Sequence, residues 1–359
     1  MASSSNSKNS THSSPGPPIA ISDYFLCRLL MIHFLHAQFH LFCQVFRHGY
    51  DTPQDFFPND KHKEVIRQHG YGQLTKLGTQ KQYELGQYIR RRYLNFLSIA
   101  YKQFEIYVQS TDCDQTLMSA QACLAGLYPV TQSQIWNPKI LWQPIPVHTV
   151  PLSQDNLLYL PFSHCPKYNE LLRETFATRD FQRQLKHYRV KYFQLLKISG
   201  YSPVDDIHNY TLPVWATHGV RTKLIKLSEF LLQAEFGFHK QVQKSRLQGE
   251  HNRKSRVRFL YLQHAATIAA LQMALNVFNG KLPPYSACHF FELYQEKNGQ
   301  YTIEMYYRNN SLRDPHPLTL PGCKFRCPLD RFTQLVSPVL VQHWTRECRS
   351  KGKHDATET

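Results

Sequence analysis

A histidine and an arginine stand together at the end of a short apolar run, in the triplet Arg47-His48-Gly49. The run, residues 41–46, is typical of a buried strand, and ligands bind at the carboxyl ends of strands in α/β folds. A histidine can act as a nucleophile, and an arginine can hold a phosphate through two parallel hydrogen bonds. The triplet therefore predicts phosphoryl chemistry. Asp51 opposes this interpretation, because it puts a carboxylate beside the expected phosphate.

Two further segments repeat this design of an apolar run, a short polar turn and then a helical pattern. Neighbouring parallel strands end at the same edge of a sheet, so the turns after them would meet there and form one cleft. The turns are Arg47-His48-Gly49, Gln109-Ser110-Thr111-Asp112 and His264-Ala265; the strand patterns cover 41–46, 104–108 and 257–262, and the helical patterns cover 76–97, 114–127 and 266–278.

The remaining pattern completes an α/β fold, in which helices flank a core sheet. Residues 288–294 and 301–307 have strand patterns on either side of Lys297-Asn298-Gly299, which predicts a β-hairpin. Residues 140–150 contain prolines and are expected to be extended. Two more helices are predicted near 181–200 and 220–247.

The composition indicates a basic, largely globular protein. Of 359 residues, 42 % are hydrophobic, enough for one large domain or two closely joined ones. The formal net charge is +16, from 42 Lys and Arg against 26 Asp and Glu, which favours phosphorylated or otherwise anionic ligands. The basic clusters at 90–92 and 251–258 are short, and no zinc-finger or RNA-binding motif accompanies them. We therefore interpret them as solvated surfaces and predict no nucleic-acid partner.

The two ends of the chain are expected to lie outside the globular part. Residues 1–23 are rich in Ser and Pro and are predicted to be disordered, as is the tail 349–359. Residues 24–40 are apolar and rich in histidine, and their role is open. Polar residues interrupt this segment too often for a membrane span, and the long polar head before it is unlike a signal peptide. The globular domain is assigned to 41–348.

Six ordered segments give the chain a resemblance to the histidine acid phosphatases from about Leu41 to Cys348. The resemblance implies a histidine-phosphatase-like core sheet flanked by helices, with a smaller, mostly helical subdomain at about 165–250. The matching segments are Tyr71–Thr75, Tyr83–Arg90, Ile135–Pro138, Leu141–Leu152, Lys244–Gly249 and Leu271–Leu275.

The resemblance also implies a reaction and the residues that carry it. In this family a histidine attacks the phosphorus of a phosphomonoester, an aspartic acid protonates the leaving alcohol, and water cleaves the phosphohistidine. His48 matches the nucleophile, Arg47 matches a phosphate-binding arginine, and His264 matches a second histidine that contacts the phosphate. The chemistry needs no cofactor and no metal.

Three positions depart from the family pattern. Asp51 and Gln109 stand where the family has arginines, and Ala265 stands where it has the proton-donating aspartate. Loss of one transition-state donor typically costs about 10²- to 10³-fold in rate, and loss of general acid catalysis about 10²- to 10⁴-fold. These effects are not simply additive. We therefore predict weak or absent phosphomonoesterase activity.

Three functional hypotheses follow. The first is an acid phosphatase that still works through His48, and the second is a catalytically dead pseudophosphatase that binds phosphomonoesters or other small anions. The third is the product of a decayed gene copy, suggested by segments that look shortened at 200–206 and 249–256.

Each site residue also has a simpler interpretation. Arg47 and His48 could belong to a solvated surface loop, and His264 could be a core histidine rather than a phosphate contact. Asp51 could pair with Arg47 or face solvent. Asp112 fits a turn or a helix cap better than an acid catalyst.

Cysteines and sequons bear on the cellular compartment. Nine cysteines cannot all pair within the chain. Turn residues flank Cys323 and Cys327, which favours a small disulfide loop. The resemblance implies the pairs Cys165–Cys348 and Cys323–Cys327, and it leaves Cys288 alone and Cys113 and Cys123 as additions. It further implies a secreted or lysosomal protein that can form a homodimer; Asn209 and Asn309 begin glycosylation sequons.

Overall fold

The computed structural model describes residues 38–52, 64, 68, 70–155, 157–159, 165–183, 185–186, 258–340 and 348. The predicted head and tail lie outside these residues. So do most of the helical subdomain expected at 165–250, the predicted helix at 220–247 and the sequon at Asn209.

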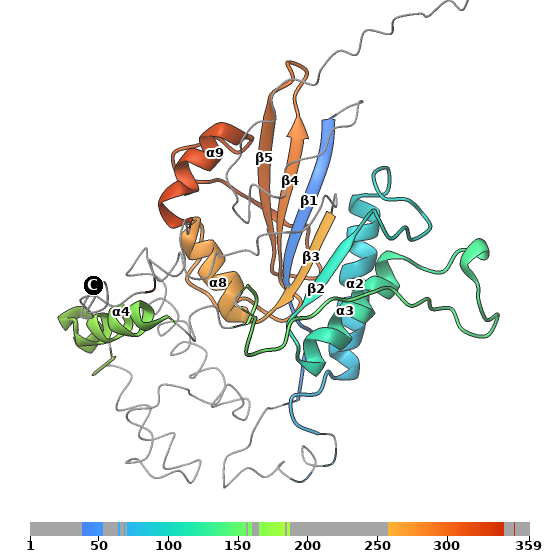
Figure 1. Cartoon of the computed structure of the whole chain (residues 1–359), viewed down its shortest axis with the longest axis horizontal. Helices are drawn as coiled ribbons and strands as arrows, with labels where there is room; N and C mark the ends of the chain where they lie inside the picture. Colours follow the sequence, from blue (N-terminus) through green and yellow to red (C-terminus); the bar gives the residue numbers. More distant parts are fainter. Residues whose placement is uncertain are drawn as a thin grey trace, which may run out of the picture.

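A mixed sheet forms the centre of the described part (Figure 1). Its strands follow the order β2-β3-β1-β4-β5-β6, and β7 pairs with β5. The first three are parallel to one another, whereas β4 runs antiparallel to β1. The strands are β1 (Gln38–Arg47), β2 (Tyr107–Ser110), β3 (Arg258–Gln263), β4 (Cys288–Gln295), β5 (Tyr301–Arg308), β6 (His316–Leu318) and β7 (Cys327–Pro328).

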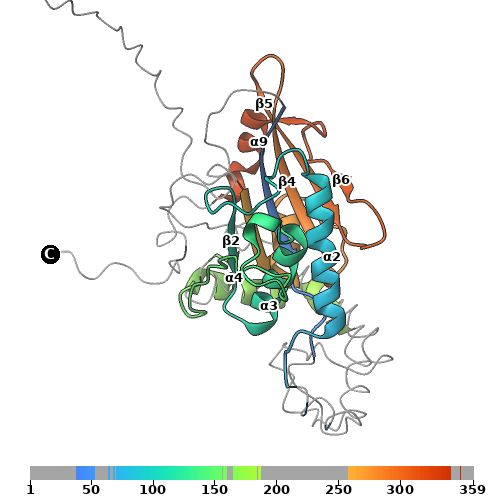
Figure 2. The same cartoon turned by 90° about the vertical axis from the view of Figure 1, so that its right-hand side faces the viewer.

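Helices cover both faces of this sheet (Figures 1 and 2). The helices α2 and α3 pack on one face, whereas α8 and α9 lie on the other. The helices of the described part are α2 (Lys76–Arg92), α3 (Asp114–Leu127), α4 (Pro166–Ala177), α8 (Ala265–Ala274) and α9 (Leu329–Val336), with 3-10 turns at Gln132–Gln134 and Ser337–Val339. No helix among the described residues is long and apolar enough to cross a membrane.

Strand β1 is buried on both faces, which explains its nearly continuous apolar sequence. Phe42 and Phe46 point into the core under α2 and α3, and Cys43 and Val45 point into the core under α8 and α9. Such alternation follows from the two-residue repeat of side chains along a strand. The strand therefore joins the two halves of the hydrophobic core and holds its carboxyl end in a fixed place.

The predicted strands and helices that lie within the described residues are present, although some of their ends are shifted; the helix expected at 266–278 ends at Ala274. Most of the helix predicted near 181–200 lies outside the described residues. The strand expected at 104–108 begins only at Tyr107, and the helix expected at 76–97 ends at Arg92. After that end the Arg90 guanidinium donates to the carbonyls of Leu97 and Ser98, at 3.2 and 2.8 Å. The Arg90 side chain therefore supplies hydrogen-bond donors to two carbonyls of the segment that follows the helix.

The structure contains both disulfides that the family resemblance implies, Cys165–Cys348 and Cys323–Cys327. Cys288 and Cys123 are free thiols in the core under α2 and α3. Cys113, the other addition, is also a free thiol, but it is only half-buried, at the N-cap of α3.

Candidate active site

The three turns predicted to converge do converge, because β2, β3 and β1 are parallel neighbours. Arg47 is in register with Gln263, and Ser110 is in register with Leu262. The residues that follow these strands therefore share one edge of the sheet. They are His48, Thr111 and His264.

His48 has one defined tautomer. Its Nδ1 atom lies 2.9 Å from the carbonyl oxygen of Gly49. A carbonyl can only accept a hydrogen bond, so Nδ1 carries the proton and Nε2 keeps its lone pair. The ring is buried, with 4 % of the residue exposed, so it does not belong to a solvated surface loop. The geometry leaves Nε2 available as a nucleophile.

The surroundings of His48 keep its imidazole neutral. Burial, then the charge of Arg47 and the neighbouring His264, lower the pKa of His48 to about 2. The hydrogen bond to Gly49 acts in the opposite direction but does not compensate. A histidine must be unprotonated to attack phosphorus. The lowered pKa of His48 therefore favours the neutral imidazole, which is the form that can attack phosphorus.

The guanidinium of Arg47 is held by the loop that precedes β4. Its Nη1 atom donates to the carbonyl of Pro283 at 2.7 Å, and its central carbon lies 3.8 Å from the centre of the Tyr285 ring. Arg47 is 7 % exposed. A cation over an aromatic face is stabilised by the negative potential of the ring. The loop thus fixes a positive charge beside His48.

The same loop fixes the backbone of the triplet. The Arg47 amide donates to Ala287 at 2.9 Å, and the Ser286 amide donates to the carbonyl of His48 at 3.1 Å. Ser286 has a φ of 60°, a left-handed conformation that costs energy for any residue except glycine. The strained turn is therefore part of the scaffold that positions His48.

Side chains from α2 and α3 complete this support. Gln82 of α2 donates to the carbonyl of Arg47 at 2.8 Å, and the amide of Gly49 donates to the Ser119 hydroxyl of α3 at 3.0 Å. A Cβ on Gly78 of α2 would lie 2.2 Å from the carbonyl oxygen of Tyr50, which requires glycine there. The helix therefore packs directly on the backbone that follows His48.

His264 lies at the N-cap of α8 and faces His48. The centroids of the two rings are 5.4 Å apart, and His264 Nε2 is 3.5 Å from the Thr111 hydroxyl. The ring of Tyr159 lies 5.8 Å from the ring of His264. His264 is half-buried rather than enclosed in the core.

Gln109, Ala265 and Asp51, the three positions expected to depart from the family pattern, lie at the same edge of the sheet. Gln109 is buried on β2, and its side-chain oxygen accepts from the Tyr107 hydroxyl at 3.4 Å. Ala265 is the first residue of α8, directly after His264. Asp51 is half-buried, and its backbone forms a bridge to Leu74. Its pairing with Arg47 stays a prediction.

Asp112 does not cap helix α3, and its side chain is not buried. It lies exposed in a bend before α3, and the N-cap is Cys113, whose side chain makes no capping hydrogen bond. The turn expected for Asp112 is present, but the cap is one residue later.

The residues that hold Arg47 and His48 in place could not be predicted from the sequence. Tyr285, Ser286, Gln82 and Ser119 lie in a proline-containing loop or on helices, where their types have no chemical signature. Arg47 and Pro283 are 236 residues apart in the chain, so no local pattern could have joined them.

Comparison with known proteins gives concordant results. The model of the histidine phosphatase superfamily (branch 2) matches residues 24–207. The prostatic acid phosphatase of Homo sapiens is 48 % identical over 343 residues, which cover 88 % of this chain and 89 % of that protein. The lysosomal acid phosphatase of Xenopus laevis is 43 % identical over 335 residues, which cover 85 % of this chain and 78 % of that protein.

Solved structures share the fold at much lower identity. The phytase from Citrobacter braakii superposes with a TM-score of 0.60 at 16 % identity, over 87 % of this chain and 99 % of that one. The Hafnia alvei phytase in complex with myo-inositol hexakis sulphate gives a TM-score of 0.55 at 16 % identity, and the match covers 87 % of this chain and 98 % of that chain. These matches agree with the mixed sheet flanked by helices.

Proposed function

Since the chain belongs to branch 2 of the histidine phosphatase superfamily, we propose that it binds phosphomonoesters and hydrolyses them slowly through His48. The family and the fold predicted from the sequence are thereby confirmed. The observation that carries the proposal is the hydrogen bond from His48 Nδ1 to Gly49, which directs the free Nε2 away from the backbone.

In the proposed reaction, Nε2 of His48 attacks the phosphorus, and the bond from phosphorus to the alcohol oxygen breaks. Arg47 is suited to offset the charge on the phosphoryl oxygens, because it is fixed before the substrate arrives. Water then attacks the phosphohistidine, the nitrogen–phosphorus bond breaks, and phosphate and neutral His48 are released. Each step keeps the nucleophile and the leaving group in line with phosphorus.

The low rate that we propose follows from the substituted positions. The methyl group of Ala265 cannot donate a proton to the leaving alcohol, so water must supply it. Gln109 brings no charge to the phosphoryl group, and Asp51 brings a negative one. General acid catalysis alone contributes about 10²- to 10⁴-fold in typical enzymes.

The test is hydrolysis of an aryl phosphate by the purified protein at about pH 5, compared with the variant His48→Ala. We expect slow turnover that this variant abolishes. Quenching in alkali, where phosphohistidine is stable, after reaction with a substrate labelled on phosphorus should trap the label on His48. Turnover that is unchanged in His48→Ala would contradict the proposal.

A binding function without turnover is the second candidate. It is favoured by Ala265, because its methyl side chain cannot donate a proton to a leaving group. Such a pseudophosphatase would bind inorganic phosphate or vanadate in calorimetry but release no alcohol from an aryl phosphate. A cooperative thermal transition of the purified protein would contradict the third hypothesis, a decayed gene product that folds poorly.

We further propose that the protein resides in an oxidising compartment, either secreted or lysosomal. The two disulfides and the exposed position of Asn309 after β5 support this location, since disulfides form and persist there. Glycosidase treatment of the expressed protein should remove glycans from Asn309 and Asn209. Light scattering tests the predicted homodimer.

A further inference from the structure

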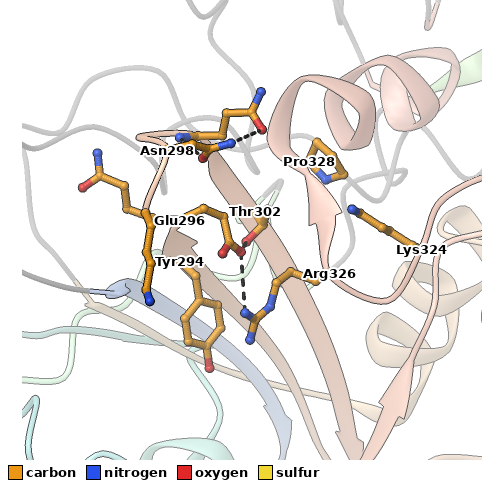
Figure 3. A pocket seen from close by; sticks show the side chains of 10 residues that line it. Tyr294, Glu296, Asn298, Thr302, Lys324, Arg326 and Pro328 are labelled. Carbon is orange, nitrogen blue, oxygen red and sulfur yellow. Dashed lines mark hydrogen bonds and ion pairs between the residues drawn. The ribbon is translucent and has the colours of Figure 1, made fainter.

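A hollow, seen from close by in Figure 3, is lined by residues at the end of the sheet opposite to the end that carries His48. It has a volume of about 600 Å³ and is formed by the tip of the β4–β5 hairpin and the disulfide loop before α9. Because β4 is antiparallel to β1, Cys288 pairs with Phe46 near the active site, while Gln295 pairs with Gln38 at the far end. The hollow is therefore separate from the phosphoryl site.

Arg326 provides a fixed cation in this hollow. Its Nε atom donates to Glu304 at 2.6 Å, its Nη1 lies 3.6 Å from Glu296, and its guanidinium lies 5.3 Å from the centre of the Tyr294 ring. Glu304 is almost fully buried, whereas 52 % of the Arg326 side chain is exposed. The buried carboxylate thus holds one edge of the guanidinium and leaves the rest accessible to solvent.

The loop that carries Arg326 is itself held in place. The disulfide between Cys323 and Cys327 closes it, and β7 pairs Cys327 with Ile303 of β5. Because the loop is already ordered, a ligand that binds to it would pay little conformational entropy for ordering it, and this favours higher affinity.

Two lysines add positive charge that no carboxylate offsets. Lys297 comes from the hairpin turn and Lys324 from the disulfide loop; both are exposed and line the hollow. Neither forms an ion pair with any residue in the described ranges. Glu296 is already engaged, since it accepts from the Thr302 hydroxyl at 2.8 Å and faces Arg326. The charge open to a ligand is therefore positive.

The rest of the lining can form hydrogen bonds with a polar ligand. Asn298 and Gln300 contribute exposed side-chain amides. Asn298 Nδ2 donates to Gln300 Oε1 at 3.1 Å, and the second Nδ2 hydrogen and the Gln300 Nε2 group are the donors that can reach a ligand. The volume lies within the range of about 300–1,000 Å³ that is usual for small-molecule sites. We propose that this hollow binds a small organic anion that bears hydroxyl groups, of the size of a phosphorylated or sulfated sugar.

Calorimetry with N-acetylglucosamine 6-sulfate tests the proposal, because the sulfate ester is not a substrate for phosphoryl transfer. Glucose 6-phosphate, neutral N-acetylglucosamine and inorganic sulfate are the comparison ligands. We expect saturable binding of both anionic sugars, weaker binding of inorganic sulfate and none of the neutral sugar. The double variant Lys297→Ala/Lys324→Ala should weaken the binding of the sulfated sugar at least about tenfold.

The matched control is Lys102→Ala/Lys139→Ala, which removes two exposed lysines elsewhere and should change the affinity less than about twofold. His48→Ala should retain the binding. An equal loss in both double variants would overturn the proposal in favour of general charge attraction. Loss of binding in His48→Ala would place the ligand at the phosphoryl site, and the absence of saturable binding would also overturn the proposal.

Discussion

The imidazole rings of His48 and His264 lie edge to face, with their centroids 5.4 Å apart. Each ring follows directly after one of two neighbouring parallel strands, β1 and β3, whose last residues Arg47 and Gln263 are in register. The sheet thus brings two imidazole rings together, and the residue that follows His264, Ala265, places no carboxylic acid beside them.

The first prediction concerns that residue. The variant Ala265→Asp should raise kcat for an aryl phosphate by about 10²-fold or more, because it restores a proton donor to the leaving alcohol. Steady-state kinetics at about pH 5 measures the change. The control is Ala265→Asn, which has nearly the same shape but no acidic proton. An equal gain in both variants would show that the effect comes from packing and not from proton transfer.

The second prediction concerns the charge of residue 51. The variant Asp51→Arg should bind inorganic phosphate at least about tenfold more tightly, since it replaces a repulsive charge by an attractive one. Calorimetry measures the affinity. Asp330→Arg makes the same change of net charge at an exposed position in α9 and serves as the control. If the control gains as much affinity, the effect is one of overall charge.

Much of the site could be predicted from the sequence because its parts are local. The apolar runs and the polar turns after them predicted the strands and the convergence of their turns at one edge of the sheet, and the structure confirms both. Helix α3 begins and ends where its pattern predicted, because its apolar stripe and its flanking turns agree.

What could not be predicted depends on contacts between distant segments. Helix α2 ends earlier than predicted, and its Arg90 side chain donates to the carbonyls of Leu97 and Ser98 in the segment that follows. Strand β2 begins later than predicted, and the Glu105 side chain before it accepts a hydrogen bond from the Ser98 amide. The stacking of Tyr285 on Arg47 likewise joins two segments that only the folded sheet brings together. Sequence periodicity carries no information about such pairs.

The third prediction concerns the close approach of α2 to the backbone after His48. The variant Gly78→Ala should lower the free energy of unfolding by at least about 1–3 kcal/mol, because its Cβ would meet the Tyr50 carbonyl at 2.2 Å. It should also lower any His48-dependent turnover, because the backbone of Gly49 and Tyr50 must shift. Denaturant unfolding and an activity assay measure the two effects. Thr79→Ala, at an exposed neighbour on the same helix, should change stability by less than about 0.5 kcal/mol.

The fourth prediction concerns stability at acidic pH. His289 of β4 is fully buried, and neither of its ring nitrogens has a hydrogen-bond partner among the described residues. Burial first, and then the charge of His316, lower the pKa of His289 to about 3. Between its ordinary pKa of about 6.5 and this value, the unfolded chain binds a proton that the folded chain does not. Stability therefore falls as the pH falls through this window.

The variant His289→Leu removes this penalty. Each pH unit within the window costs about 1.4 kcal/mol for one such group, so the loss of unfolding free energy between about pH 7 and pH 4.5 should be roughly 2.5 kcal/mol smaller in the variant. Urea unfolding at the two pH values measures it. Replacement of the exposed His316 by glutamine is the control and should leave the difference nearly unchanged. If His289→Leu loses as much stability on acidification as the parent protein, His289 must accept its proton inside the fold, and the buried ring would not be neutral.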